Sequence, residues 1–360
     1  MARVLIAAGG TAGHVVPALA IAGALRDRGA EVEWAGGERA EAELVPRAGF
    51  PFHAMAMAGI DRKHPVRAAR AVGLAAAAAV RARGLVRRGR FDAVLGGGGY
   101  AAGPVGLAAA SLRVPLFLTE ADSHLGVTNR LLAPLARRLF LAFPVEGRTG
   151  ERYEVTGRPV PPGTGQADRG AARERFGLDP AEPCLLVFGG SLGARTLNEA
   201  TIEAFGTEAP CAVLHVCGRR DFEALRGRVD PRAAHYRLEP YVEPFAEALA
   251  AADLCAARSG GSVWELAAAG IPSILVPYPH ATADHQTKNA HFMVAAGAAV
   301  TIPDEALDGA RLSREVSSLL QAPERLAALA EGAREVARPH AAEDIAERVL
   351  ALSAGGLRLR

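Results

Sequence analysis

Two glycine-rich turns, about half the chain apart, are the parts of this sequence best suited to chemistry. Apolar residues 4–8 lead into Gly-Gly-Thr-Ala-Gly at 9–13, and apolar residues 184–188 lead into Gly-Gly-Ser-Leu-Gly at 189–193. Each stretch predicts a buried strand, a tight turn and a helix start, which together point backbone N–H groups and the positive helix end at a ligand. The pair favours two α/β domains that face each other across a cleft and bind an anionic, phosphate-bearing substrate.

His14 is the residue at the first turn that could move a proton. It opens the helical pattern after the turn, so we expect its side chain to face the cleft. The imidazole could accept a proton from a bound substrate, and the positive helix end would lower the pKa of His14 and keep it neutral near pH 7. The alternative is a histidine that only caps the turn or packs against it.

The composition narrows the class of protein. The 360 residues are enough for two domains, and 50% apolar with 22% charged residues is typical of a globular protein. A net charge of +2 argues against a general nucleic-acid binder. The four cysteines form no Cys-x-x-Cys pair, which favours buried thiols in a reducing compartment over a zinc site or a disulfide.

The sequence predicts neither a signal peptide nor a membrane span. The apolar run near the N-terminus breaks at Gly9 and belongs to a strand, turn and helix unit. The longest uncharged run near the middle, residues 71–80, is too short to cross a bilayer. We therefore expect a soluble or at most peripheral protein.

Short apolar strands alternate with longer helical patterns, which predicts parallel sheets covered by helices on both faces. The Pro- and Gly-rich stretch 158–165 predicts a linker between a first domain, residues 1–157, and a second domain, residues 166–338. Residues 339–360 are expected to form a helix that packs back on the first domain. The candidate strands are 3–8, 31–35, 92–95, 115–119, 140–143 and 153–156, followed by 184–188, 212–216, 254–257, 273–276 and 299–302.

Glycine-rich turns follow several of these strands, at residues 9–13, 96–99, 189–193 and 259–262. Ligands of open parallel sheets bind beyond the carboxyl ends of the strands, where these turns are expected. The sequence has no Gly-x-Gly-x-x-Gly with a suitably placed acidic residue, no phosphate-loop lysine motif and no Asp-x-Asp pair. A dinucleotide, or a metal ion held on a diphosphate, is therefore not the favoured ligand.

Six motifs follow one another in order along the chain. They are GGTAGHVVP at 9–17, GGGY with GP at 97–104, EAD with GVTN at 120–129, GGSLGAR at 189–195, RSGG with ELAAAGIP at 258–272, and the set His280, Asp284, His285, Gln286, Asn289 and Ala290. These motifs resemble those of the MurG family of N-acetylglucosaminyltransferases, in glycosyltransferase family 28. The similarity covers nearly the whole chain and implies the GT-B fold, two Rossmann-like parallel-sheet domains separated by a cleft.

The resemblance implies that the second domain binds UDP-GlcNAc and that the first receives a lipid-linked acceptor. Glu265 would hold the ribose hydroxyls, although an acidic residue that stabilises the helix dipole is the alternative. The other residues implied in substrate binding are Thr11, Ala12, Gly13, Glu120, Asp122 and Arg158, Gly190 and Ser191 at the diphosphate, Tyr241 and Val242 at the uracil, Gly260, Gly261 and Ser262, and His285, Gln286 and Asn289 at the sugar hydroxyls.

The sequence departs from the family pattern at several of these positions. Asp122 stands where the family usually has Asn, so it is either a rival general base or a tolerated isostere. Pro161 stands where an arginine is expected, and Arg158 either replaces that arginine or is an exposed linker residue. Leu192 replaces a glutamine, and segment 259–265 is one residue shorter than the family spacing.

Arginines also recur along residues 62–90. If this stretch is one continuous helix, Arg67, Arg70, Arg81 and Arg88 lie along one side together with Leu74 and Leu85. Such a face suits an anionic membrane surface. The alternative is a solvated arginine face in a helix broken at its glycines.

The resemblance implies an inverting transferase that moves GlcNAc from UDP-GlcNAc to the muramoyl 4-hydroxyl of lipid I, giving lipid II and UDP. One of His14 and Asp122 would be the base, and no metal or other cofactor is expected. The implied partners are the cytoplasmic face of the bacterial membrane, where the protein would be peripheral, and other proteins of cell-wall synthesis and division, but no nucleic acid. The rivals are a related glycolipid glycosyltransferase, a UDP-GlcNAc epimerase, and an inactive nucleotide-sugar-binding protein.

Overall fold

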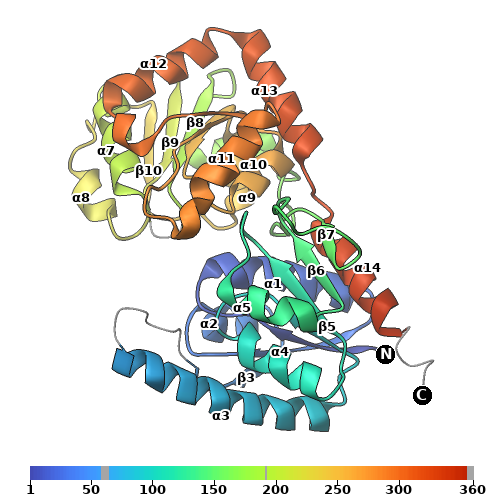
Figure 1. The fold of residues 1–360 in the computed structure, drawn as a ribbon. Helices are drawn as coiled ribbons and strands as arrows, with labels where there is room; N and C mark the ends of the chain where they lie inside the picture. The colour runs from blue at the N-terminus through green and yellow to red at the C-terminus, as the bar shows by residue number, and fades with distance from the viewer. Residues whose placement is uncertain (58–64, 191–192, 355–360) are drawn as a thin grey trace. The chain divides into compact units, whose positions relative to one another are not determined.

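The computed structural model describes residues 1–57, 65–190 and 193–354, with the backbone alone for 65–72 and 354 (Figure 1). The chain divides into two compact units, Met1–Pro161 with Pro339–Arg360, and Pro162–Arg338. We call them the first and the second domain. The division falls inside the Pro- and Gly-rich stretch 158–165.

The first domain is a parallel sheet with the strand order β3-β2-β1-β4-β5-β6-β7. Its central strands are apolar on both faces because helices cover both faces. In β1, Val4 and Ile6 pack against α1, α2 and α14, whereas Leu5 and Ala7 pack against α3, α4 and α5. The strands are β1 (Arg3–Ala7), β2 (Glu31–Gly36), β3 (Phe52–Ala54), β4 (Ala93–Gly96), β5 (Leu116–Glu120), β6 (Arg138–Leu141) and β7 (Tyr153–Val155). The helices are α1 (Ala12–Asp27), α2 (Ala40–Arg47), α3 (Pro65–Gly89), α4 (Ala102–Ser111), α5 (Val127–Leu132), the short η1 (Ala133–Leu135) and α14 (Ala341–Ala354).

The second domain is also a parallel sheet, in the order β10-β9-β8-β11-β12-β13. Leu185 and Val187 of β8 lie in its core with apolar residues of α7 and α12. The strands are β8 (Cys184–Phe188), β9 (Ala212–Val216), β10 (Tyr236–Glu239), β11 (Leu254–Ala257), β12 (Ser273–Leu275) and β13 (Ala299–Thr301). The helices are α6 (Arg169–Phe176), α7 (Arg195–Phe205), α8 (Phe222–Arg226), α9 (Phe245–Ala251), α10 (Val263–Ala269), η2 (Thr282–Asp284), α11 (His285–Ala295), η3 (Asp304–Ala306), α12 (Gly309–Leu320) and α13 (Pro323–Val336).

Parallel sheets are confirmed, but the strands differ from the prediction at three places. The sequence does not predict β3 or β10, which lie at sheet edges and are only partly buried. β6 covers Arg138–Leu141 rather than 140–143 because Arg138 continues the pairing with β5 opposite Phe117. Because Arg138 is charged, a search for apolar runs does not identify it as the start of β6.

The last described helix, α14, belongs to the first domain (Figure 1). Ile345, Ala346 and Val349 are buried in the same core as Ile21 and Leu25 of α1. α3 runs without a break from Pro65 to Gly89, as one continuous helix. In the described part of the chain, no helix is both long and apolar enough to cross a membrane.

Candidate active site

The loops that follow β1 and β4 pack against each other around His14, at the carboxyl edge of the first sheet. Gly98 has φ +90°, and a Cβ atom there would lie 2.6 Å from His14 Cδ2. Only glycine adopts this backbone conformation readily and leaves room for the ring. Thr11 and Gly13 beside it are exposed, and Ala12 is half-buried. This turn is therefore open to a ligand on the side of His14.

The His14 imidazole is held neutral by its surroundings. Thr11 Oγ1 lies 3.3 Å from its Nδ1 atom. Burial is the largest influence on the pKa of His14 and lowers it below 6.5. The negative charges of Asp122 and Glu41 raise the pKa, whereas the positive charge of Arg158 lowers it further. A neutral ring near pH 7 can accept a proton, and the nearby Asp122 can stabilise the cation that results.

Arg158 binds the loops of the first domain. Its guanidinium donates to the carbonyl of Gly13 at 2.7 Å and to that of Ala121 at 3.4 Å. The side chain is half-buried and ties the start of α1 to the loop after β5. Its positive charge lies near enough to His14 to lower the pKa of the imidazole.

Glu120, at the end of β5, is 6% exposed and holds its own loop. Its Oε2 accepts hydrogen bonds from Gly126 N–H at 2.8 Å and from Asn129 Nδ2 at 2.9 Å. Burial raises its pKa, and these hydrogen bonds oppose the shift. The structure thus shows Glu120 as a buried carboxylate that fixes the loop after β5.

The turn after β8 begins with Gly189 and Gly190 and ends at α7. Ser191 and Leu192 lie outside the described residues. Gly193 has φ +73°, and a Cβ atom there would lie 2.3 Å from the carbonyl oxygen of Cys217. Gly193 therefore packs tightly on the end of β9, and Gly190 is exposed.

A buried polar chain supports this turn. Asn198 Nδ2 donates to the Cys217 carbonyl at 2.9 Å, and Asn198 Oδ1 accepts from His215 Nε2 at 3.0 Å. Tyr236 then donates its hydroxyl proton to His215 Nδ1 at 2.7 Å. Burial lowers the pKa of His215 to about 3, so the ring stays neutral and these directions are fixed.

The loops after β11 and β12 bring several of the expected sugar-donor residues together. Ser259 Oγ donates to the Gln286 carbonyl at 2.8 Å, and Tyr278 N–H donates to Gln286 Oε1 at 2.9 Å. This bond directs the Gln286 Nε2 atom toward Gly260, where a Cβ atom would lie 3.8 Å away. Asn289 is fully buried and donates to the Ser259 carbonyl at 3.1 Å, so it supports the loop.

His285 opens α11 after two residues in a costly backbone conformation. Ala283 and Asp284 both have φ 54°, in the left-handed region. His285 Nδ1 donates to the Thr282 carbonyl at 2.9 Å. Backbone strain of this kind is concentrated at ligand sites and turns.

The remaining expected residues stand at two further loops of the second domain. Glu265 is half-buried in the first turn of α10, the helix that follows Gly260, Gly261 and Ser262 in the chain. Tyr241 is 43% exposed, and the Arg219 guanidinium lies over its ring, 4.7 Å from the ring centre. Val242 is buried.

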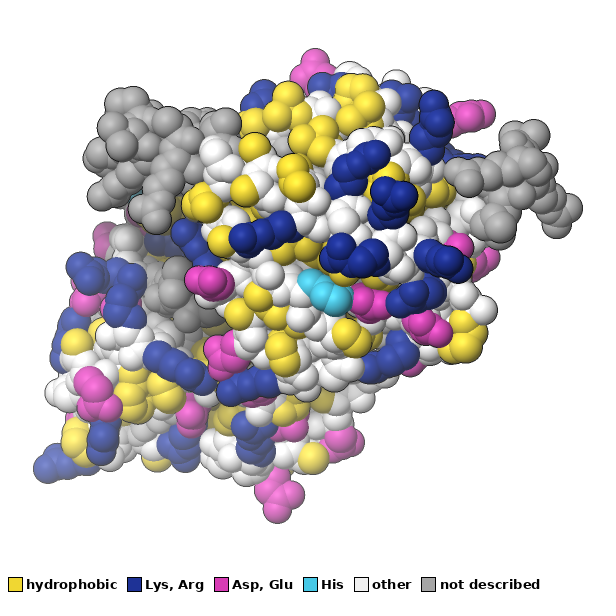
Figure 2. Space-filling view, turned by 90° about the horizontal axis from the view of Figure 1, so that it is seen from below, with side chains coloured by type: hydrophobic (Ala, Val, Ile, Leu, Met, Phe, Trp, Pro, Cys, Tyr) yellow, Lys and Arg dark blue, Asp and Glu magenta, His cyan; other side chains and the backbone are white. Residues whose placement is uncertain are grey.

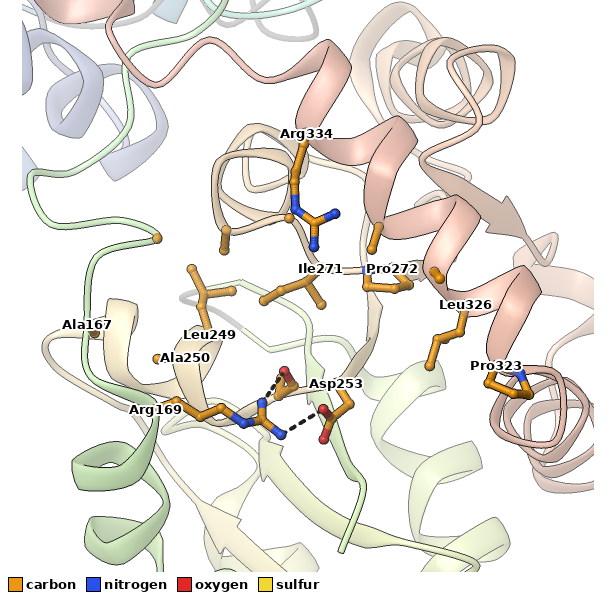
Figure 3. A pocket seen from close by; sticks show the side chains of 16 residues that line it. Ala167, Arg169, Leu249, Ala250, Asp253, Ile271, Pro272, Pro323, Leu326 and Arg334 are labelled. Carbon is orange, nitrogen blue, oxygen red and sulfur yellow. Dashed lines mark hydrogen bonds and ion pairs between the residues drawn. The ribbon is translucent and has the colours of Figure 1, made fainter. Parts of the chain in front are cut away.

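A cavity of about 470 Å³ lies elsewhere in the second domain (Figure 3). Asp253 and Pro272, which precede β11 and β12, and Arg334 of α13 are among its lining residues. Asp253 pairs there with Arg169 at 2.7 Å. The cavity lies at the amino ends of the strands, whereas parallel sheets bind ligands at the carboxyl ends. We do not assign it to the substrate.

Sequence reasoning did not single out Glu41 or Asn198. Glu41 accepts a hydrogen bond from Gly10 N–H in the first glycine-rich turn, and Asn198 Nδ2 would lie 3.6 Å from a Cβ atom at Gly193 in the turn after β8. A search for Asn beside a glycine motif could have found Asn198, whereas Glu41 carries no such signal. Among the described residues, no group of three or more His, Cys, Asp or Glu side chains is placed to hold a metal ion.

Comparisons with known proteins cover both domains. The model of the glycosyltransferase family 28 N-terminal domain matches residues 4–141, and that of the C-terminal domain matches residues 184–349. A curated relative from Moorella thermoacetica is 43% identical in an alignment that covers 97% of this chain and 98% of the relative. It is named UDP-N-acetylglucosamine–N-acetylmuramyl-(pentapeptide) pyrophosphoryl-undecaprenol N-acetylglucosamine transferase.

Solved structures agree with these matches. The crystal structure of Acinetobacter baumannii MurG has a TM-score of 0.80 and 31% identity, and covers 98% of this chain and 100% of that one. UDP-GlcNAc 2-epimerase from Neisseria meningitidis covers 97% of this chain and 100% of its own, with a TM-score of 0.66 but 14% identity, so it shares the fold alone. The GT-B fold is confirmed, and the chain belongs to glycosyltransferase family 28 and, within it, to the MurG enzymes.

Proposed function

We propose that the protein transfers GlcNAc from UDP-GlcNAc to the muramoyl 4-hydroxyl of undecaprenyl-pyrophosphoryl-MurNAc-pentapeptide, giving lipid II and UDP. The observation that carries this proposal is the 43% identity, over nearly all of both chains, to a relative named for this reaction. The loops around His14 and around Gln286 supply a base and a sugar-binding amide in the two domains.

In the proposed mechanism, His14 accepts the proton of the 4-hydroxyl as its oxygen attacks the anomeric carbon. The bond to UDP breaks with its electron pair on the phosphate oxygen, and the configuration at the anomeric carbon inverts. Backbone N–H groups near Gly190 and the positive end of α7 stabilise the leaving diphosphate. Glu265 holds the ribose, and Gln286 with His285 holds the sugar.

The direct test is UDP release and product mass with UDP-GlcNAc and a short-chain lipid I analogue. Excess EDTA is included because the sequence lacks an Asp-x-Asp pair, and we propose that no metal takes part. A disaccharide product with stoichiometric UDP supports the proposal. Sugar-donor consumption without acceptor would support an epimerase instead, and binding without product would leave a nucleotide-sugar-binding protein.

The pH dependence of this reaction is expected to report His14. Because the base must be neutral, kcat/KM should fall as the pH drops through the pKa of His14, which lies below 6.5. Asp122→Asn removes a negative charge that raises this pKa, so the acid limb should move to lower pH. Rate profiles of both proteins measure the shift; loss of turnover at every pH would instead make Asp122 the base.

We also propose that the face of α3, α4 and α5 meets an anionic membrane surface. Apolar side chains and arginines are mixed on this side of the first domain (Figure 2). Val80, Leu107 and Leu131 are 74%, 52% and 72% exposed there. Arg81 and Arg88 are exposed on α3, whereas the side chains of Arg67 and Arg70 lie outside the described ones. Flotation with anionic and neutral liposomes tests this, and binding to neither refutes it.

A further inference from the structure

Glu41, at the start of α2, is a fully buried carboxylate whose described partners are neutral hydrogen-bond donors. Its Oε2 accepts from Gly10 N–H at 2.9 Å. Its Oε1 accepts from Gly37 N–H at 2.9 Å and from the Tyr100 hydroxyl at 2.7 Å. Burying a carboxylate costs free energy unless such hydrogen bonds compensate for its lost hydration. The groups that Glu41 binds therefore indicate its role.

The three donors come from three different loops. Gly10 follows β1, Gly37 follows β2, and Tyr100 follows β4, so all lie at the carboxyl edge of the first sheet. Gly10 stands directly before Thr11 and the start of α1. The single side chain of Glu41 therefore ties the backbone that carries His14 to both neighbouring loops.

The charge of Glu41 matters as well as its position. Burial raises its pKa, but the Gly10 N–H, the Tyr100 hydroxyl and the Gly37 N–H outweigh this, and the pKa lies below its usual value. The side chain is thus a carboxylate that accepts hydrogen bonds only. Tyr100 correspondingly has a raised pKa, chiefly through burial, and keeps its proton for Glu41.

We propose that Glu41 is a positioning residue for the transfer reaction, fixing the turn that carries Thr11 and His14. The inference rests on the proposed function and extends it to a residue that does not touch the substrate. Glutamine cannot replace Glu41, because either orientation of its amide aims an NH₂ group at Gly10 N–H or Gly37 N–H, neither of which can accept. Misplacing the base by about 1 Å can cost a rate factor of about 10².

The test compares Glu41→Gln with Glu43→Gln, a matched change on the same helix. Glu43 is exposed and pairs with Arg47 at 3.0 Å, so its variant should keep kcat within about twofold. Glu41→Gln should lower kcat about 100-fold. Its affinity for UDP-GlcNAc should stay within about twofold, because the proposed sugar-donor residues lie on the second domain.

Tyr100→Phe gives a second variant that keeps the charge and removes one donor. We expect a loss of about 3- to 10-fold in kcat, and no further loss when it is added to Glu41→Gln. Hydrogen exchange of residues 8–14 should be faster in Glu41→Gln than in the wild type, with peptides of the second domain unchanged.

Hydrogen exchange separates this proposal from the proposed function, because it needs no activity. If the wild-type protein transfers no GlcNAc, the function fails while the exchange of residues 8–14 still decides the role of Glu41. Exchange unchanged in Glu41→Gln, or kcat within about threefold of wild type, would overturn the positioning role. A parallel loss of UDP-GlcNAc binding would also overturn it, because the effect of Glu41→Gln would then not be confined to the first domain.

Discussion

Replacing His14 by alanine is expected to lower kcat for GlcNAc transfer by about 10²- to 10⁴-fold, the range for loss of a general base. The change removes the imidazole that Thr11 and the turn at Gly98 hold at the start of α1. UDP-GlcNAc affinity should stay within about twofold of wild type, because the proposed sugar-donor residues belong to the second domain. Steady-state rates and calorimetric titration with UDP-GlcNAc measure the two effects separately.

The matched control is His291→Ala, on the exposed side of α11. It should change neither quantity, because surface substitutions away from a site are usually close to neutral. Full turnover in His14→Ala would exclude His14 as the base. A loss of UDP-GlcNAc binding in that variant would show instead that the substitution acts beyond the first domain.

Replacing Gln286 by alanine is expected to lower kcat/KM for UDP-GlcNAc by about 10- to 100-fold, the cost of one to two hydrogen bonds left unmade in a site. Tyr278 N–H holds the Gln286 Oε1 atom, so the Nε2 atom is directed to the Gly260 side of the loop. Alanine would remove that amide and leave Tyr278 N–H without its acceptor.

Lys288→Ala provides the control, since Lys288 is exposed two positions further along α11. Initial rates against UDP-GlcNAc concentration, at fixed acceptor, give kcat/KM for both variants. An unchanged value in Gln286→Ala would remove Gln286 from the sugar site. Equal losses in both variants would point to damage of α11 as a whole.

Most of the sheet architecture follows from the sequence because central parallel strands are buried on both faces and read as apolar runs. Cys184–Phe188 and Ala212–Val216 appear at the predicted positions for this reason. β10 (Tyr236–Glu239) does not, because an edge strand pairs on one side only and tolerates Arg237 and Glu239. β10 forms because it pairs with β9. This pairing leaves no pattern in the residues of β10 themselves.

The candidate site shows the same division between local and long-range information. Glycine motifs predict where the turns lie, since backbone conformation is a local property. Glu41 and Glu43 are both acidic residues in the first turn of α2, yet one is fully buried and the other exposed. The sequence near α2 does not say which of the two binds Gly10 and Tyr100, because these partners lie on loops far away in the chain. In the same way, Arg158 donates to the carbonyl of Gly13, 145 positions earlier.

The position of α14 has a consequence for how the protein is made. The first domain contains the N-terminus of the chain, yet Ile345, Ala346 and Val349 complete its core beside Ile21 and Leu25. During translation, the second domain emerges whole before this last helix does, although domains generally fold from the N-terminal end as they are synthesised. Synthesis of the first domain therefore begins before that of the second domain but is completed after it. Until α14 is synthesised and packs, one side of the core of the first domain stays exposed.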